Sequence, residues 1–225
     1  MTEPAPIFTI GHSNHSLDAF VDLLKRHGIN AVADVRSQPF SRRLPHFNRE
    51  ALEPALRQHG IVYVFLGDQL GGRPGQPSLY DADGRVDYER VRQQEFFRRG
   101  LERLEKARQK YTVALMCSEE NPLACHRGLM IAPALAEQGI LSAHVRGDGT
   151  LESLAQMEKR LLDETGVDGG FLDGLFAATF TDADRRALLG DAYRMMARKK
   201  SFRLKPAEEE HAASESEEDD GEDQE

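Results

Sequence analysis

The sequence predicts an α/β fold with a mostly parallel, five-stranded sheet and helices on both faces. Two observations support this prediction: short apolar segments alternate with segments of helical periodicity, and the apolar segments are continuous instead of alternating with polar residues. Strands that are buried on both faces carry such continuous apolar runs, and strands that alternate with helices are typical of a parallel sheet.

The individual elements follow from apolar runs, helical spacing and capping residues. The predicted strands are residues 7–11, 29–35, 61–66, 111–116 and 141–145. The predicted helices span about 16–27, 48–59, 87–109, 125–138, 151–164 and 181–200. Pro133 should kink or break the fourth of these helices, because proline lacks a backbone N–H. Thr181 and Asp184 form the pattern of an N-terminal cap for the last one.

Composition divides the chain into three parts. Residues 1–147 are the predicted α/β core domain, residues 148–204 a C-terminal helical extension packed on the core or linked to it, and residues 205–225 a disordered acidic tail. Gly166 to Gly174 is the predicted connector within the extension. Residues 208–225 contain eleven acidic and no basic side chains, so the net charge of −9 arises from the tail. A segment with so few apolar residues cannot offset its ordering entropy. It either solubilises the protein or competes with nucleic acid for a basic patch.

The chain has the composition of a cytoplasmic protein. No stretch approaches the ~18 consecutive apolar residues that a membrane span needs, and the N-terminus lacks the basic and apolar regions of a secretory signal. Two cysteines are too few for a disulfide framework, so both thiols are expected to be free. We therefore expect no membrane association, whereas these patterns do not determine the oligomeric state.

The residues that follow the predicted strands are the first candidates for a functional site. Ligands of open α/β sheets bind beyond the carboxyl ends of the strands, and here all five ends are followed by polar side chains. The arginines among them favour a phosphate or another anion. The candidates for binding such an anion are Ser13, Arg36, Arg73, His126 and Arg127.

The segment from Cys117 to Arg127 combines the residue types that nucleophilic catalysis needs. Cys125 is expected at or near a helix N-cap, where the helix dipole and neighbouring positive charge would lower the thiol pKa and give a nucleophilic thiolate. Glu119 and His12 are the candidates for a general acid or base or an orienting group. Neither cysteine has an arginine six residues later, which a cysteine phosphatase loop would need.

Each of these residues also has a structural interpretation. Cys125 could be buried and inert, with Arg127 bonded to a carboxylate such as that of Glu119. Cys117, at the end of an apolar strand, is expected to be a packed small hydrophobe. A metal would require Cys117, Cys125 and His126 to converge, with His12 as a further candidate ligand, but the chain has no C-x-x-C pair, and an eight-residue offset is not a standard ligand spacing. The sequence therefore predicts no metal ligands and no cofactor.

Four blocks of residues carry a resemblance to a known family. They are Thr9-Ile10-Gly11-His12-Ser13; Asp34-Val35-Arg36 with Pro39 and Ser41; Tyr63 with Leu70-Gly71-Gly72; and Cys117-Ser118-Glu119 with Cys125-His126-Arg127. In this order they resemble the domain of unknown function 488 family, DUF 488. The resemblance implies an α/β fold and a cytoplasmic protein, and it implies no particular activity.

Three hypotheses for the function follow. The first is an enzyme or ligand-binding protein that acts on a phosphate-bearing ligand, a nucleotide or nucleic-acid component, at the Cys-His-Arg segment. The second is a non-catalytic module that binds single-stranded nucleic acid through the basic and aromatic loop formed by Arg36, Phe40, Arg42, Arg43, His46 and Phe47. The third is a sensor that uses Cys117 and Cys125 for thiol redox chemistry or metal binding.

Overall fold

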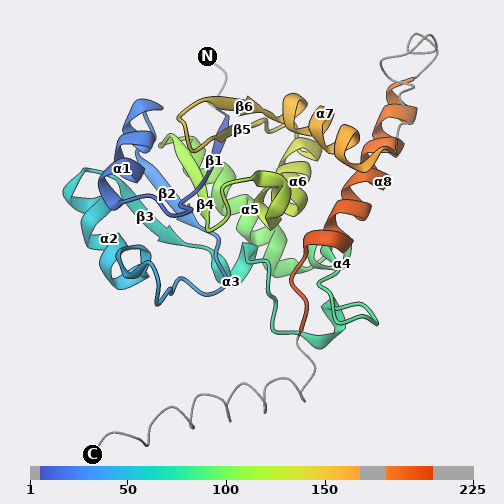
Figure 1. Cartoon of the computed structure of the whole chain (residues 1–225), viewed down its shortest axis with the longest axis horizontal. Coiled ribbons are helices and arrows are strands. Elements are labelled where there is room, and N and C mark those ends of the chain that lie inside the picture. The colour runs from blue at the N-terminus through green and yellow to red at the C-terminus, as the bar shows by residue number, and fades with distance from the viewer. Residues whose placement is uncertain (1–5, 168–180, 205–225) are drawn as a thin grey trace, which may run out of the picture.

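The computed structural model describes residues 6–167 and 181–204 and confirms the α/β class (Figure 1). A six-stranded sheet with the order β3-β2-β4-β1-β5-β6 lies between two layers of helices. The five parallel strands are β1 (Ile7–Gly11), β2 (Ala31–Asp34), β3 (Val62–Phe65), β4 (Val113–Cys117) and β5 (Ser142–Val145). Because β4 is inserted between β1 and β2, the carboxyl ends of these three strands are neighbours.

The sixth strand corrects the sequence prediction, which had five strands and a helix from residue 151. Strand β6 (Leu151–Ser153) instead pairs antiparallel with β5, and α7 (Leu154–Thr165) begins after it. Ser153 ends the strand and caps the helix: its hydroxyl accepts the N–H of Gln156, whose side chain accepts the N–H of Ser153. This reciprocal capping box fixes the point where strand gives way to helix.

One face of the sheet is covered by α1 (Leu17–Arg26) and α2 (Arg49–Gln58). Ser16 caps α1, since its side chain accepts the N–H of Ala19. The two helices pack their buried side chains against this face of the sheet in one cluster, which includes Phe20, Leu24, Leu52 and Leu56 from the helices and Ile10, Val32 and Met116 from the strands. The helical spacing of these apolar residues therefore predicted both helices.

The other face is covered by the remaining helices. They are α3 (Gly67–Leu70), α4 (Tyr88–Arg92), α5 (Glu95–Arg108), α6 (Ala132–Glu137), α7 and α8 (Asp182–Lys200), with a π-helical turn over Arg127–Ile131. Short 3-10 turns occur at Pro45–Phe47, Pro77–Leu79 and Pro122–Ala124. The single helix predicted over residues 87–109 is in fact two helices. Pro133 lies in the first turn of α6, where its missing N–H costs no hydrogen bond.

The C-terminal helices pack on the core. Met157 and Leu161 of α7 and Met196 of α8 are buried in the same cluster as Leu101 of α5 and Leu115 of β4. Thr181 and Asp184 form the expected capping box of α8. None of the helices in the described ranges combines the length and apolar character that a bilayer crossing requires. Residues 168–174 of the predicted connector and the predicted tail, residues 205–225, lie outside the described residues.

Candidate functional site: a buried cysteine–cysteine–histidine cluster

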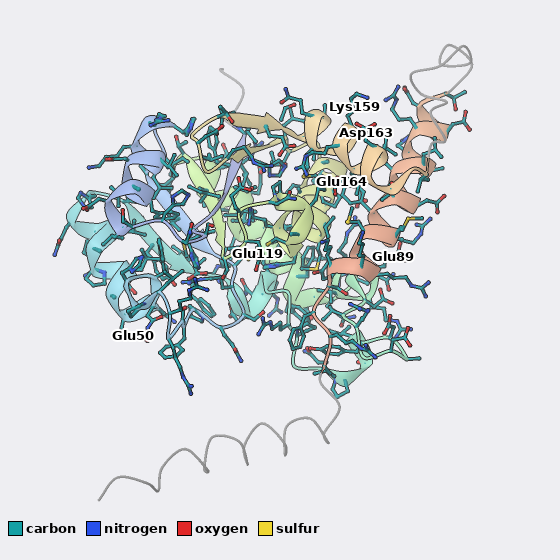
Figure 2. All side chains as sticks on the ribbon, in the orientation of Figure 1. Glu50, Glu89, Glu119, Lys159, Asp163 and Glu164 are labelled. Carbon is teal, nitrogen blue, oxygen red and sulfur yellow. The ribbon has the colours of Figure 1, made fainter. Side chains whose placement is uncertain are left out.

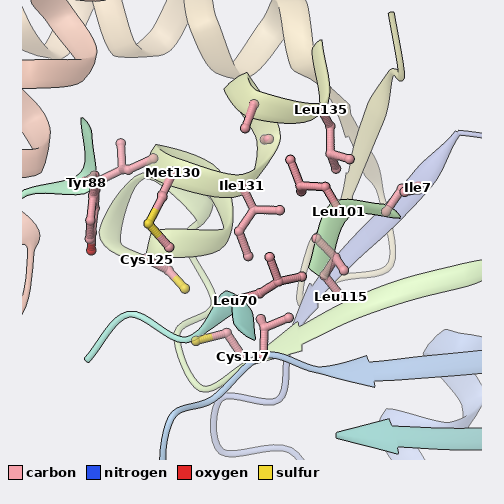
Figure 3. Close-up of a cluster of buried hydrophobic side chains, with 14 of the residues drawn as sticks. Ile7, Leu70, Tyr88, Leu101, Leu115, Cys117, Cys125, Met130, Ile131 and Leu135 are labelled. Atoms are coloured by element: carbon pink, nitrogen blue, oxygen red, sulfur yellow. The ribbon is translucent and has the colours of Figure 1, made fainter. Parts of the chain in front are cut away.

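Two thiols and one imidazole meet at the carboxyl end of β4. Cys117 is the last residue of this strand, and Cys125 and His126 directly precede the π-helical turn. The His126 Nδ1 lies 3.8 Å from the Cys117 Sγ and 3.6 Å from the Cys125 Sγ. All three side chains are buried, and Figure 3 shows the two sulfur atoms turned toward the same space. The loop from β4 to the helical turn thus brings Cys117, Cys125 and His126 together, although their spacing in the sequence does not predict that they meet.

The ring of His126 is fixed by its other nitrogen. Its Nε2 lies 2.9 Å from the carbonyl oxygen of Val35, which can only accept a hydrogen bond. In the neutral ring the proton therefore sits on Nε2, and Nδ1 presents a lone pair to the two sulfurs. Gly72 packs against the ring: a Cβ atom at this position would lie 2.9 Å from the His126 Cγ. This contact gives the Gly71-Gly72 pair a steric role.

The two thiols differ in acidity. A hydrogen bond from the Cys125 thiol lowers the pKa of Cys117 well below its usual range, helped by the nearby His126 and Arg127 and opposed by burial. Burial raises the pKa of Cys125, and its role as donor to Cys117 raises it further. The direction is the reverse of the sequence prediction, which gave the lowered thiol pKa to Cys125; Cys117 is packed in the apolar core, as predicted. The Cys125 Sγ does accept the N–H of Arg127 at 3.5 Å, as a capping side chain would, but burial outweighs this contact.

The guanidinium of Arg127 is bonded to the protein itself. The side chain is fully buried, and it donates to the carbonyl oxygens of Glu119 and Glu120 and to the Thr9 hydroxyl. The same loop passes over Gly11, where any Cβ atom would collide with the Glu119 carbonyl. Arg127 therefore holds the loop after β4 in place, and its partner is the main chain, not the Glu119 carboxylate considered from the sequence.

Arg36 is likewise bonded within the protein. Its guanidinium forms a buried bidentate ion pair with Asp34, with Nη2 to Oδ2 at 2.6 Å and Nε to Oδ1 at 2.9 Å. Nη2 also donates to the Phe47 carbonyl at 2.8 Å, and the Tyr63 hydroxyl donates to Asp34 at 2.7 Å. Burial and the Asp34 charge raise the pKa of Tyr63 above its usual range. Arg36 therefore ties the following loop to the sheet.

His12 faces this ion pair from the end of β1. Its Nε2 lies 3.3 Å from the Arg36 Nη1, its Nδ1 lies 2.9 Å from the Ser13 carbonyl oxygen, and its ring stacks on Phe47. Burial and the Arg36 charge lower its pKa to about 4, so the ring is neutral near pH 7. With Nδ1 donating to the carbonyl, Nε2 carries the lone pair and accepts the hydrogen bond from the Arg36 Nη1.

The remaining predicted site residues are more exposed. Ser13 is the only non-glycine residue in the described part of the chain with positive φ (45°), a strained conformation. Glu119 is exposed after β4 (Figure 2), and its carboxylate has no bonding partner among the described residues. Its neighbour Glu120 pairs instead with Arg146, at 2.9 Å to both oxygens. The guanidinium of Arg73 lies 4.4 Å over the Phe202 ring.

Sequence reasoning assigned no role to three residues that hold the site together. They are Asp34, Tyr63 and the carbonyl of Val35, all on or beside β2 and β3. The available signal was a carboxylate at the end of an apolar strand, two residues before an arginine. Such a carboxylate would be expected to be paired, because an isolated charge is costly to bury.

These features define an α/β protein with a buried cysteine–cysteine–histidine cluster at the carboxyl edge of its sheet. The chain belongs to the family described as "Domain of unknown function DUF488", whose model matches residues 16–132. The matched range contains the whole Cys117–Arg127 segment, whereas the block around His12 precedes it.

Comparison with other proteins adds little. None of the curated proteins matches this chain. One solved structure, described as "Putative phosphatase (DUF442)" from Shewanella putrefaciens CN-32, is 16% identical and covers 85% of this chain and 87% of its own, with a TM-score of 0.35. A likeness at this level bears on neither the fold nor the function.

Proposed function

We propose that the protein binds a phosphate-bearing ligand, a nucleotide or nucleic-acid component, at the carboxyl edge of the sheet and acts on it with the Cys117–Cys125–His126 cluster. The observation that carries this proposal is the direct connection between the cluster and a basic loop. His126 bonds the carbonyl of Val35, and the next residue, Arg36, begins the loop and is bonded to its far end at Phe47. Reactive groups and a cationic surface therefore share one edge of the sheet.

The basic loop, residues 36–48, offers two arginines whose guanidinium groups contact no partner among the described residues. Arg42 and Arg43 are exposed, and neither guanidinium has an ion-pair or hydrogen-bond partner in the described part of the chain. Phe40, 64% exposed, lies in the same loop. Unpaired guanidinium groups favour phosphate, and an exposed aromatic ring offers a surface on which a base can stack.

This assignment changes which residues would hold the phosphate. Arg36 and Arg127, the arginines that the sequence favoured, serve as positioning residues because their guanidinium groups are buried and bonded to Asp34 and to main-chain carbonyls. Arg42 and Arg43 take their place as phosphate ligands. Glu119, exposed and unpaired among the described residues, stays the candidate acid or base.

A binding measurement tests the proposal. Fluorescence anisotropy of the full chain with a labelled mononucleotide should show saturable binding that weakens at least about 10-fold in an R42A/R43A variant, since each lost charge-assisted contact is worth about 1.5–3 kcal/mol. The matched control is K106A/K110A, which removes one positive charge from the last turn of α5 and one from the segment between α5 and β4, at the opposite edge of the sheet. Absence of mononucleotide binding, or equal loss in both variants, overturns the proposal.

A second candidate, the non-catalytic nucleic-acid module, is favoured by the exposed Phe40 in the same loop as two arginines that have no partner in the described ranges. It predicts that a single-stranded oligonucleotide binds while a mononucleotide does not. The logarithm of affinity should fall against the logarithm of salt concentration with a slope of about −0.7 for each phosphate contacted. R42A/R43A should then reduce that slope by about 1.4. Equal slopes in the variant and the wild type would exclude this candidate.

A further inference from the structure

The atoms of the buried cluster are arranged as the ligands of a metal ion would be. We propose that Cys117, Cys125 and His126 form a binding site for a soft transition-metal ion, with Zn²⁺ as the first candidate. Only the role of the ion, which would act on the ligand bound beside it, rests on the proposed function. The inference that the ion binds stands on the cluster alone.

The two sulfur–nitrogen distances within the cluster match those of a tetrahedral zinc site. Bonds of about 2.3 Å from zinc to sulfur and about 2.0–2.1 Å from zinc to nitrogen give a sulfur–nitrogen edge of about 3.6 Å at the tetrahedral angle. The two sulfur–nitrogen distances are 3.6 and 3.8 Å. All three ligand atoms lie within 4.8 Å of one another. The sulfur–sulfur edge of such a site is about 3.8 Å, so an ion would require the two sulfurs to approach each other by at most about 1 Å.

The contacts of His126 are those of a metal-binding histidine. Metal-bound imidazoles usually donate their second ring nitrogen to a carbonyl or carboxylate, which fixes the tautomer and the ring orientation. Here Nε2 bonds the Val35 carbonyl at 2.9 Å, and Gly72 packs against the ring. The Nδ1 lone pair is thereby held toward both sulfurs before any ion binds.

The ligand set also selects the ion. Two thiolates and an imidazole favour zinc and other soft or borderline metals over Mg²⁺ and Ca²⁺, which take oxygen ligands. Two thiolates and a divalent ion make a complex with no net charge, which suits a site where all three side chains are buried, because an uncompensated charge there is costly. Three protein ligands leave the fourth position of a tetrahedral ion open to water or to a ligand atom, as in catalytic zinc sites.

Cobalt binding tests this inference directly. The full chain, reduced and stripped of metal by a chelator, is titrated with Co²⁺ and monitored for thiolate-to-cobalt charge-transfer and tetrahedral d–d absorption. We expect one ion per chain, displaced by Zn²⁺. The variants C117S, C125S and H126N should each bind Co²⁺ more than about 100-fold more weakly, beyond the 10–100-fold that loss of a second-shell contact costs. The matched control is H59N, an exposed imidazole outside the cluster, and it should bind as the wild type does.

The wild-type titration decides the matter even where a variant fails to fold. Absence of cobalt absorption in a protein whose two thiols both titrate as free overturns the inference. Equal absorption from the wild type and from C117S or C125S also overturns it, because the ion then binds elsewhere. The outcome is separable from the proposed function: metal binding without mononucleotide binding refutes only the function, and mononucleotide binding without metal binding refutes only the metal site.

Discussion

Arg36 and Asp34 form a bidentate ion pair in which both side chains are buried, at 4% and 0% exposure. Each charge is compensated mainly by the other, because few other groups contact the pair. The Tyr63 hydroxyl contacts Asp34, and His12 and the Phe47 carbonyl contact Arg36. Breaking a buried pair by removing one partner is costly, since the other charge is left without compensation.

The first prediction concerns this pair. R36A should lower the free energy of unfolding by about 3–5 kcal/mol, measured by urea denaturation at neutral pH. R57A, which removes the exposed pair with Glu53, is the matched control and should change it by less than about 1 kcal/mol. Equal losses in the two variants would show that the buried pair contributes no more than a surface contact.

The second prediction separates a positioning role from ligand binding at Arg127. R127K keeps the charge, but its single ammonium group cannot reach both carbonyls, so at least one part-buried acceptor loses its donor at a cost of about 1–3 kcal/mol. We expect a loss of stability of about 2 kcal/mol or more and faster cleavage after Glu119 and Glu120 by a glutamate-specific protease. A variant that is as stable and as resistant as the wild type, yet fails to bind a mononucleotide, would instead make Arg127 a ligand-binding residue.

The third prediction uses the contact between Gly72 and His126. A Cβ atom at residue 72 would lie 2.9 Å from the ring, so G72A should displace His126 and destabilise the protein by about 1–3 kcal/mol, as overpacking does. Gly75 is the matched control because nothing lies within 4 Å of its added Cβ atom, and G75A should stay within about 0.5 kcal/mol. Thermal unfolding of the two variants side by side provides the measurement, and similar melting temperatures would contradict the prediction.

The fourth prediction is a pH dependence at His144, which is buried and hydrogen-bonded to the Thr9 hydroxyl at 2.7 Å. Burial and the Arg127 charge lower its pKa to about 3, against 6.5 for an ordinary histidine. Between these pH values only the unfolded chain binds the proton. The wild type should therefore lose up to about 1.4 kcal/mol per pH unit as the pH falls from 6.5 toward 3.

The variant H144Q isolates this effect from that of the carboxylates, which titrate in both proteins. The difference in unfolding free energy between the wild type and H144Q should be constant above pH 7 and shift against the wild type below 6.5. A difference that does not vary with pH down to 4 would mean that His144 is protonated in the folded protein.

The sequence predicted the strands of the sheet better than the hydrogen bonds and ion pairs of the candidate site. Continuous apolar residues identify a buried strand such as β4 in the sequence. Strand β6 has only three residues and pairs through its main chain, so no side-chain pattern indicated it. The edge strand β3 reads as almost wholly apolar, yet Val62 and Val64 are 39% and 37% exposed.

The same dependence on main-chain contacts explains why the sequence predicted the location of the candidate site but not its hydrogen bonds. Its location followed from the strand ends, which topology alone brings to one edge. The partners of Arg127 and His126 are main-chain carbonyls, at Glu119, Glu120 and Val35, and every residue type has such a carbonyl. No pattern of side chains can therefore predict these bonds. The convergence of Cys117 and Cys125 likewise depends on the path of the loop between them.

The peptide unit between Val35 and Arg36 is held on both of its polar atoms. His126 bonds its carbonyl oxygen at 2.9 Å, and the Asp34 carboxylate accepts its N–H at 3.0 Å. A single rigid plane thus touches the cysteine–histidine cluster on one side and the buried ion pair on the other. A change at the sulfurs that displaces His126 acts on this plane, so the Arg36 amide resonance reports on both the cysteine–histidine cluster and the ion pair.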